Sequence, residues 1–322
     1  MRLCVLHLGS EKTGTSSVQR YLGQHRDALL QDGIWYPRSF ASPTAHVHLG
    51  LSSAALRDSL KADNPDVAAF ATELASIKAR DVRMTVFSSE FFHSEMRDRG
   101  AVERLKAFLA QHFDAFRLVY YARRQDHMLA SMHSTAVQGG WSTNPAALSV
   151  YETKGHYYFD HAAICDLWAG VFGRESLVCR IYERERLKNG DVVDDFAAML
   201  GIAPDPKQAR LKANESLSFE TIHVLLLLNA SRHKDNKELR RKLIAAGRRR
   251  GGARVPLLTR AEAQEFLSRF TLSNKKFFEH YVDPALAGAF AAGFEGFPQA
   301  VPPPPRPREI VEFVFGRGER PR

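Results

Sequence analysis

Short apolar runs alternate with longer amphipathic stretches over the first 180 residues. The runs that predict strands buried on both faces of a sheet are Arg2–Leu8, Arg83–Ser88, Arg117–Ala122 and Leu177–Ile181. Apolar positions recur with helical spacing over Thr15–Leu30, Val67–Ala79, Val102–His112, Gln125–Val137 and Tyr158–Phe172. This alternation is typical of an α/β fold with three layers, in which helices cover both faces of a parallel sheet.

The last third of the chain shows mainly helical periodicity. The predicted helices are Phe219–Ser231, Asn236–Gly247, Arg260–Phe270 and Asn274–Val282. We expect them to pack on the sheet within one domain, residues 1–297. A proline-rich stretch then predicts an extended tail over residues 298–322, in which Ile310–Phe315 forms at most a short strand. Residues 138–155 carry the composition of a loop.

The segment after the first apolar run carries the clearest chemistry. It reads Gly9-Ser10-Glu11-Lys12-Thr13-Gly14-Thr15-Ser16-Ser17 and leads into a helical stretch. A strand–loop–helix unit of this kind presents backbone N–H groups, hydroxyls and an ammonium to one place, and the helix N-terminus adds partial positive charge. The segment therefore predicts a phosphate site and a nucleotide ligand.

The position of the lysine decides between two kinds of phosphate loop. Gly9 and Gly14 have the spacing of the Walker A loop, G-x-x-x-x-G-K-[ST], and Ser16 occupies its hydroxyl position. Thr15, however, stands where the Walker lysine belongs, and Lys12 precedes the second glycine. A P-loop kinase or NTPase, which would need magnesium, is therefore the alternative and not the first interpretation.

The order K-T-G-T-S-S resembles the 5′-phosphosulfate loop of sulfotransferases that use PAPS (3′-phosphoadenosine 5′-phosphosulfate). A second motif agrees with it. Arg123 ends a predicted strand, and Ser131 lies about two helical turns further on, so both can reach one anion. This R-(x)7-S arrangement resembles the 3′-phosphate site of the same family, and its spacing favours Arg123 over Arg124. The likeness to bacterial, glycan-type members continues through Glu152–Ile202, Asn214–Ser218 and Ser273-Asn274.

The resemblance implies transfer of a sulfuryl group from PAPS to a hydroxyl of a carbohydrate or glycolipid, leaving adenosine 3′,5′-bisphosphate. It implies no metal, and the sequence shows no carboxylate cluster suited to magnesium. Lys12 would stabilise the leaving phosphate. The residues that would bind the cofactor are Lys12, Thr13, Gly14, Thr15, Ser16, Ser17, Arg123 and Ser131.

A general base must remove the proton of the acceptor hydroxyl. Glu90 follows the second predicted strand and precedes the apolar Phe91 and Phe92, where burial would raise its pKa toward the useful range. Glycan sulfotransferases resemble this in placing a catalytic glutamate after the corresponding strand. Small-molecule sulfotransferases use a histidine there, so His93 is the alternative base.

Charge is concentrated in one segment. The chain carries a net +9, and Arg232–Arg254 contributes eight of it, with ten basic and two acidic residues. Such a run is usually a solvated helix face; its other possible role is contact with an anionic glycan, an anionic membrane surface or the cofactor. It lacks the interleaved aromatic residues of RNA-binding motifs, so no specific nucleic acid is expected.

Three further features bear on location. No apolar run reaches the roughly 18 residues of a membrane span, and the N-terminus does not have the pattern of a signal peptide. The three cysteines are scattered without metal-binding spacing. We therefore expect a cytoplasmic protein, peripheral to the inner membrane surface if the basic segment binds lipid.

Overall fold

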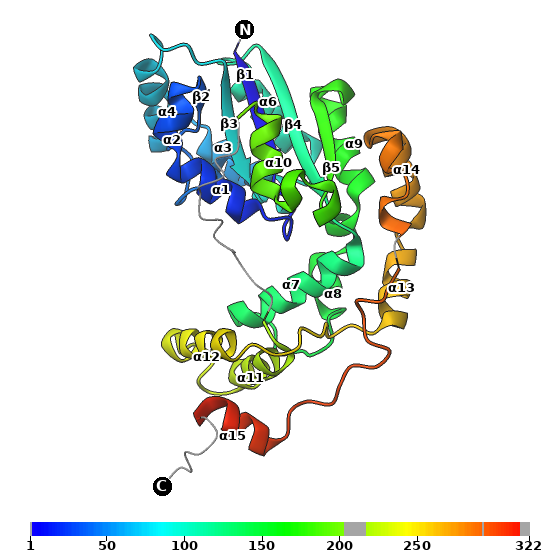
Figure 1. Ribbon diagram of the computed structural model, residues 1–322. Coiled ribbons are helices and arrows are strands. Elements are labelled where there is room, and N and C mark those ends of the chain that lie inside the picture. The colour runs from blue at the N-terminus through cyan, green and yellow to red at the C-terminus, as the bar shows by residue number, and fades with distance from the viewer. Residues whose placement is uncertain (1, 203–216, 292, 316–322) are drawn as a thin grey trace. The chain divides into compact units, whose positions relative to one another are not determined.

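The computed structural model describes residues 2–202, 217–291 and 293–315 (Figure 1). These residues form two compact units. The first contains residues 2–123, 157–202 and 272–290, and the second contains residues 124–156, 217–271, 291 and 293–315. The predicted phosphate loop and Glu90 belong to the first unit, and the basic segment belongs to the second.

A five-stranded parallel sheet forms the centre of the first unit. Its strands are β1 (Leu3–Leu8), β2 (Ile34–Trp35), β3 (Met84–Ser89), β4 (Ala115–Ala122) and β5 (Leu177–Ile181). Their order across the sheet is β2-β3-β1-β4-β5. The register aligns Leu8 with Ser89 of β3 and with Tyr120 of β4, so these three strands end at nearly the same level.

Helices cover both faces of this sheet (Figure 1). The helices of the first unit are α1 (Thr15–Gln24), α2 (Arg26–Gln31), α3 (Ser53–Ser59), α4 (Pro65–Ser76), α5 (Phe91–Ser94), α6 (Arg99–Leu109), α9 (His161–Phe172), α10 (Val192–Met199) and α14 (Thr271–Tyr281). Side chains alternate between the faces along β1: Leu6 packs in one apolar cluster with α6 and α9, and Val5 packs in another with α1 and α10. The predicted α/β fold with a parallel sheet between two helical layers is confirmed.

The second unit is helical. It contains α7 (Gln125–Gly139), α8 (Ser149–Lys154), α11 (Phe219–Ala230), α12 (Lys237–Arg250), α13 (Arg260–Ser268) and α15 (Pro307–Phe315). Its own apolar cluster includes Val137, Leu225, Leu243 and Phe313. The late helices were expected to pack on the sheet. Phe277 and Tyr281 of α14 do join the apolar cluster of the sheet, whereas α11 and α12 bury their apolar side chains in the cluster of the second unit.

Four local predictions differ from the structure. The stretch predicted as one helix over Thr15–Leu30 breaks at His25 into α1 and α2. The loop predicted over residues 138–155 contains α8, and β2 was not predicted because it is only two residues long. Within the predicted extended tail, residues 307–315 form α15, since Ile310 and Phe313 lie three positions apart and face the same cluster.

Candidate active site

The three central strands bring separate parts of the sequence to one edge of the sheet. β3, β1 and β4 are neighbours and run parallel, so the residues that follow them lie side by side. The backbone N–H of Gly9 donates to the carbonyl oxygen of Ser89 at 3.0 Å, which ties the loop after β1 to the end of β3. Glu90, Lys12 and Arg123 each follow one of these strands.

Two glycines of the phosphate loop occupy positions that exclude a side chain. A Cβ at Gly9 would lie 2.5 Å from Cγ2 of Thr15 and 3.0 Å from the carbonyl oxygen of Ser89. Gly14 has a φ of 76°, and its Cβ would lie 2.6 Å from Cγ1 of Val192. The spacing of the two glycines is therefore required by the turn between β1 and α1.

Lys12 has a positive φ of 69°, which is unusual for a residue with a side chain. Residues held in this region cost free energy and concentrate at functional sites. The hydroxyls of Thr13 and Thr15 donate to the carbonyl oxygen of Ser10 at 2.6 and 3.1 Å, and so brace the loop from within.

The N-terminus of α1 opens directly from this loop. It has neither a side-chain cap nor an acidic residue in its first turn. The first N–H groups of a helix lack intrahelical acceptors, so this end offers donors and partial positive charge to an anion. Thr15 and Ser16 are the first residues of the helix, as the sequence predicted for a phosphate site.

Charged groups converge on Lys12. Burial lowers the pKa of Lys12, and the positive charge of Arg123 lowers it further, while Glu90 and Glu11 raise it. The guanidinium of Arg123 donates from Nη1 to the carbonyl oxygen of Lys12 at 2.7 Å. The same guanidinium lies 5.6 Å from the centre of the Tyr182 ring, which follows β5. Arg123 is thus oriented toward the phosphate loop.

Arg124, the neighbour of Arg123, has a different environment. Its guanidinium pairs with both carboxylate oxygens of Asp126, with Nε–Oδ1 and Nη2–Oδ2 distances of 2.8 Å. The two side chains are 3% and 0% exposed. Arg124 also donates to the carbonyl oxygen of Gly293 and stacks on Phe294. Arg124 therefore holds the second unit together, which agrees with the choice of Arg123 for the ligand.

Glu90 has the properties expected of a general base. Burial raises its pKa to about 7, and the negative charge of Glu11 adds to this effect, whereas Lys12 and Ser16 lower the pKa. The Ser16 hydroxyl donates to Oε1 of Glu90 at 3.5 Å, so the carboxylate lies beside the start of α1. A carboxylate with a pKa near 7 can accept a proton at neutral pH.

His93 is packed in the core of the same unit. It is 1% exposed, its Nε2 lies 3.0 Å from the carbonyl oxygen of Tyr158, and its ring packs edge-on against the Tyr158 ring. This setting supports Glu90 over His93 as the base.

The contacts described so far include neither Ser131 nor the segment Asn214–Ser218. Ser131 lies on α7 in the second unit and is half-buried, and its role beside Arg123 stays a prediction. Of the late segment that resembles glycan sulfotransferases, residues 214–216 lie outside the described part of the chain.

The sequence analysis gave no role to two residues near the site, Glu11 and Tyr182. Glu11 raises the pKa of Glu90 further, and burial together with the negative charge of Glu11 raises the pKa of Tyr158. Tyr182 follows β5 and lies under Arg123. Glu11 stands within the loop motif itself, and Tyr182 follows a predicted strand, so position at a strand end was the signal that could have found them.

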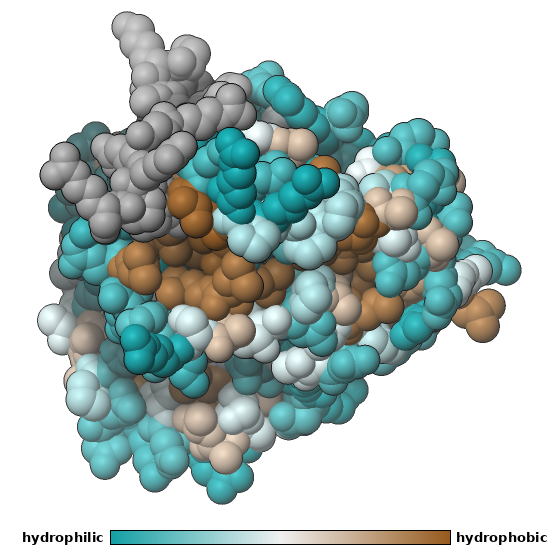
Figure 2. All heavy atoms as spheres, turned by 90° about the horizontal axis from the view of Figure 1, so that it is seen from below, coloured by the Kyte–Doolittle hydropathy of each residue, from teal (hydrophilic) through white to brown (hydrophobic). Residues whose placement is uncertain are grey.

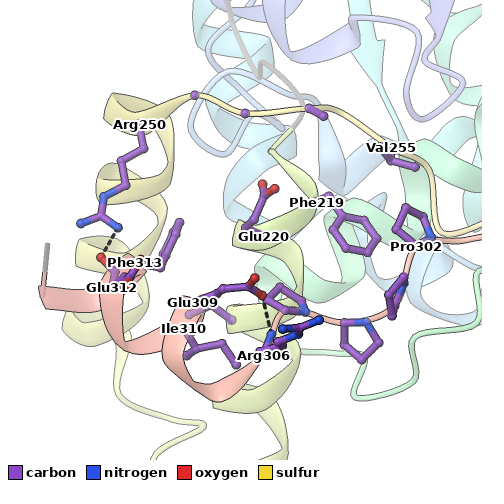
Figure 3. Close-up of a pocket in the computed structure, with 17 residues that line it drawn as sticks. Phe219, Glu220, Arg250, Val255, Pro302, Arg306, Glu309, Ile310, Glu312 and Phe313 are labelled. Carbon is purple, nitrogen blue, oxygen red and sulfur yellow. Dashed lines mark hydrogen bonds between the residues drawn. The ribbon is translucent and has the colours of Figure 1, made fainter. Parts of the chain in front are cut away.

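A pocket lies within the second unit (Figure 3). Its volume is about 1100 Å³, and α11, the end of α12, the prolines 302–305 and α15 line it. Phe219 and Ile310 contribute apolar walls, and Glu220, Arg250 and Arg306 contribute charge. Figure 2 shows hydrophobic residues gathered on one face of the molecule, with hydrophilic residues around them.

The described residues contain neither a metal-binding cluster nor a membrane-spanning helix. Among residues 2–202, 217–291 and 293–315, no three or more His, Cys, Asp or Glu side chains are grouped to hold a metal ion. Over the same ranges, no helix is both long and apolar enough to cross a membrane.

Comparisons with known proteins yield distant likenesses. No protein-family model matches the chain. An uncharacterized protein of Archaeoglobus fulgidus is 29% identical over 169 residues, which is 51% of this chain and 45% of that protein. The chain thus matches about half the length of this relative. A solved sulfotransferase from Alicyclobacillus acidocaldarius has 19% identity and a TM-score of 0.38, over 73% of this chain and 95% of the other. Neither likeness assigns an activity.

Proposed function

We propose that the first unit transfers a sulfuryl group from PAPS to a hydroxyl of a carbohydrate or glycolipid. The observation that carries this proposal is the convergence of Lys12, Arg123 and Glu90 beside the uncapped N-terminus of α1. Two cations and open N–H groups suit a phosphosulfate, and a carboxylate with a pKa near 7 suits an acceptor proton.

The residues divide the reaction between them. The bond from sulfur to the 5′-phosphate oxygen breaks while a bond from sulfur to the acceptor oxygen forms, and Glu90 takes the acceptor's proton. The ammonium of Lys12 and the N–H groups of Thr15 and Ser16 stabilise the charge that develops on the leaving phosphate. Catalysis is then mainly positioning and electrostatic stabilisation, as in phosphoryl transfer.

Arg123 has a separate role in the proposal, which is to bind the 3′-phosphate together with Ser131. Its contact with the Lys12 carbonyl gives the guanidinium a fixed orientation. The motif resemblance supports the pairing with Ser131. A nucleotide that carries both phosphates should therefore bind more tightly than one that carries only the 5′-phosphate.

Ligand-dependent thermal unfolding tests the proposal. Adenosine 3′,5′-bisphosphate at about 100 times its Kd should stabilise the chain by roughly 2.7 kcal/mol, and AMP at the same concentration by less. Sulfuryl transfer from PAPS should then be measured with EDTA present, over a panel of neutral glycans and glycolipids. Equal stabilisation by AMP would refute the two-phosphate site. Stronger stabilisation by magnesium-ATP would favour a P-loop kinase or NTPase.

A further inference from the structure

One side of α12 is a basic surface. Lys237, Arg241, Lys242, Arg248 and Arg249 are all exposed and lie on the same side of the helix, and we call this set the basic face. At 100° per residue, Lys237, Arg241 and Arg248 fall within an arc of about 40°. From Lys237 to Arg248 the stripe runs roughly 16 Å along the helix axis.

The opposite side of α12 is occupied by the unit's own core. Leu243 is buried in the apolar cluster, and a Cβ at Gly247 would overlap Thr221 of α11, so the two helices touch closely there. Arg240 donates from Nη1 to Oδ1 of Asn229 at 2.7 Å. Arg250 donates to the carbonyl oxygen of Glu312 at 2.6 Å and stacks on Phe313 (Figure 3). These two arginines serve the fold.

The basic face itself has little acidic compensation. Lys242 pairs with Glu238 at 3.1 Å, and both side chains are largely exposed. Within the part of the chain that the structure describes, no ion pair engages Lys237, Arg241, Arg248 or Arg249. Four like charges along one exposed helix repel one another, and a bound polyanion would relieve that repulsion.

The chemistry of the face limits the kind of polyanion. An interfacial membrane helix needs a free apolar side, but the apolar side of α12 faces α11. Binding of single-stranded nucleic acid relies on aromatic side chains, and α12 contains none. The large apolar side chains exposed in this unit, Trp141, Leu227 and Val311, lie on other segments. A flexible chain of charged sugars needs neither apolar insertion nor base stacking.

We propose that the basic face of α12 binds an anionic polysaccharide, such as a sulfated or carboxylated glycan. The choice of a glycan over duplex nucleic acid rests on the proposed sulfuryl transfer to carbohydrate. The contact is electrostatic: the cations of the face replace the small counterions along the chain, and binding weakens steeply as salt rises.

A charge-matched pair of variants tests this surface in the full chain. The first variant is Lys237→Gln/Arg241→Gln/Arg248→Gln, and the control is Arg57→Gln/Lys78→Gln/Arg80→Gln, three exposed cations of the first unit. Both lose three positive charges. Binding of fluorescent dextran sulfate is measured by anisotropy between 50 and 200 mM salt, with uncharged dextran as the blank. Circular dichroism and thermal unfolding verify that both variants fold.

The α12 variant should lose roughly a hundredfold in affinity for dextran sulfate at the lowest salt, with a shallower dependence on salt. The control should lose less than tenfold. Equal losses in the two variants would overturn the assignment to α12, because general charge would then explain binding. Tighter binding per anionic group to a 20-base-pair DNA duplex, or to phosphatidylglycerol vesicles, than to dextran sulfate would overturn the assignment of a polysaccharide as the ligand.

The proposed sulfuryl transfer has a separate test, which is stabilisation by adenosine 3′,5′-bisphosphate. We expect the bisphosphate to stabilise the α12 variant as much as it stabilises the natural chain. If the chain binds dextran sulfate through α12 but is not stabilised by the bisphosphate, the proposed polyanion surface stands and the proposed sulfotransferase function is refuted.

Discussion

The phosphate loop and the basic face of α12 both present positive charge, in opposite settings. Lys12 is a single half-buried ammonium, and the charges of Arg123, Glu90 and Glu11 act on it. The basic face has five exposed cations, of which Lys242 pairs with Glu238. Charge in a partly dry site acts strongly on one fixed position, whereas exposed charge is screened by water and salt. The first setting suits chemistry, and the second suits attraction of a large partner.

The largest effect should come from Glu90, the carboxylate that completes the first setting. Glu90→Gln should lower kcat/KM by roughly 10²–10⁴-fold, because the acceptor proton loses its base, while bisphosphate affinity stays unchanged. In the natural chain kcat/KM should rise with pH through about 7 and level off above it, since the carboxylate is the active form. The variant should lack this rise, and the exposed Glu95→Gln should retain it.

Stability gives an independent check on the environment of Glu90. Its pKa is raised from the ordinary value of 4.5, so its contribution to the folded state is full below pH 4.5 and is lost as the pH passes 7. Glu90→Gln should therefore stabilise the chain at pH 8 relative to the natural chain, and more so than at pH 4. Normal turnover in Glu90→Gln beside an inactive but folded His93→Ala would transfer the base to His93.

Arg124 should affect folding rather than catalysis. Arg124→Ala leaves the buried carboxylate of Asp126 without its partner, which typically costs 3–5 kcal/mol of the free energy of unfolding. Urea unfolding measures the change, and Arg123→Ala is the matched neighbour, which we expect to unfold near the natural midpoint. Similar midpoints for Arg124→Ala and the natural chain would mean that this pair does not hold the second unit together.

Lys12 should affect both binding and turnover. Lys12→Ala should lower kcat by about 10²–10³-fold, the range for losing one stabiliser of transition-state charge, and should weaken the bisphosphate as well. Lys61→Ala, which removes an exposed lysine paired with Asp58, is the control for lost charge. If kcat with PAPS survives in Lys12→Ala, the ammonium does not contact the leaving phosphate.

Arg123 should distinguish one phosphate from the other. Arg123→Ala should weaken adenosine 3′,5′-bisphosphate by about 1.5–3 kcal/mol and AMP by much less, since only the former carries a 3′-phosphate. Isothermal titration calorimetry gives both affinities, and Ser131→Ala should shift them in the same direction. An equal loss for the two nucleotides would place Arg123 on the 5′-phosphate instead.

The smallest effect belongs to the exposed pair on α12. Lys242→Gln should change the free energy of unfolding by no more than about 0.5 kcal/mol, because exposed ion pairs four residues apart on a helix contribute little. Urea unfolding at low and high salt provides the measurement. A loss above 1 kcal/mol would show that the basic face serves the fold and would weaken its contrast with the phosphate loop.

Local patterns in the sequence were sufficient for the four longer strands and for the loop and helix that follow β1. β1, β3, β4 and β5 match the predicted apolar runs to within two residues, because strands buried on both faces leave an uninterrupted apolar signal. The helix break at His25 and the helical state of residues 307–315 were missed. A short amphipathic segment near prolines gives a weak local signal, and its packing against α11 and α12 decides its structure.

The sequence by itself determined the loop from Gly9 to Ser17 as the candidate for phosphate binding, because the glycines, Lys12 and the hydroxyls lie within nine consecutive residues. Only the tertiary structure decided which distant groups join them. The strand order β3-β1-β4 sets Glu90 and Arg123 beside Lys12, and packing places the side chain of Arg124 against Gly293 and Phe294. The same holds for α12, where packing against α11 and α15 separates the arginines of the fold from the exposed ones. Neighbours across a sheet or between helices are far apart along the chain, so no local pattern encodes them.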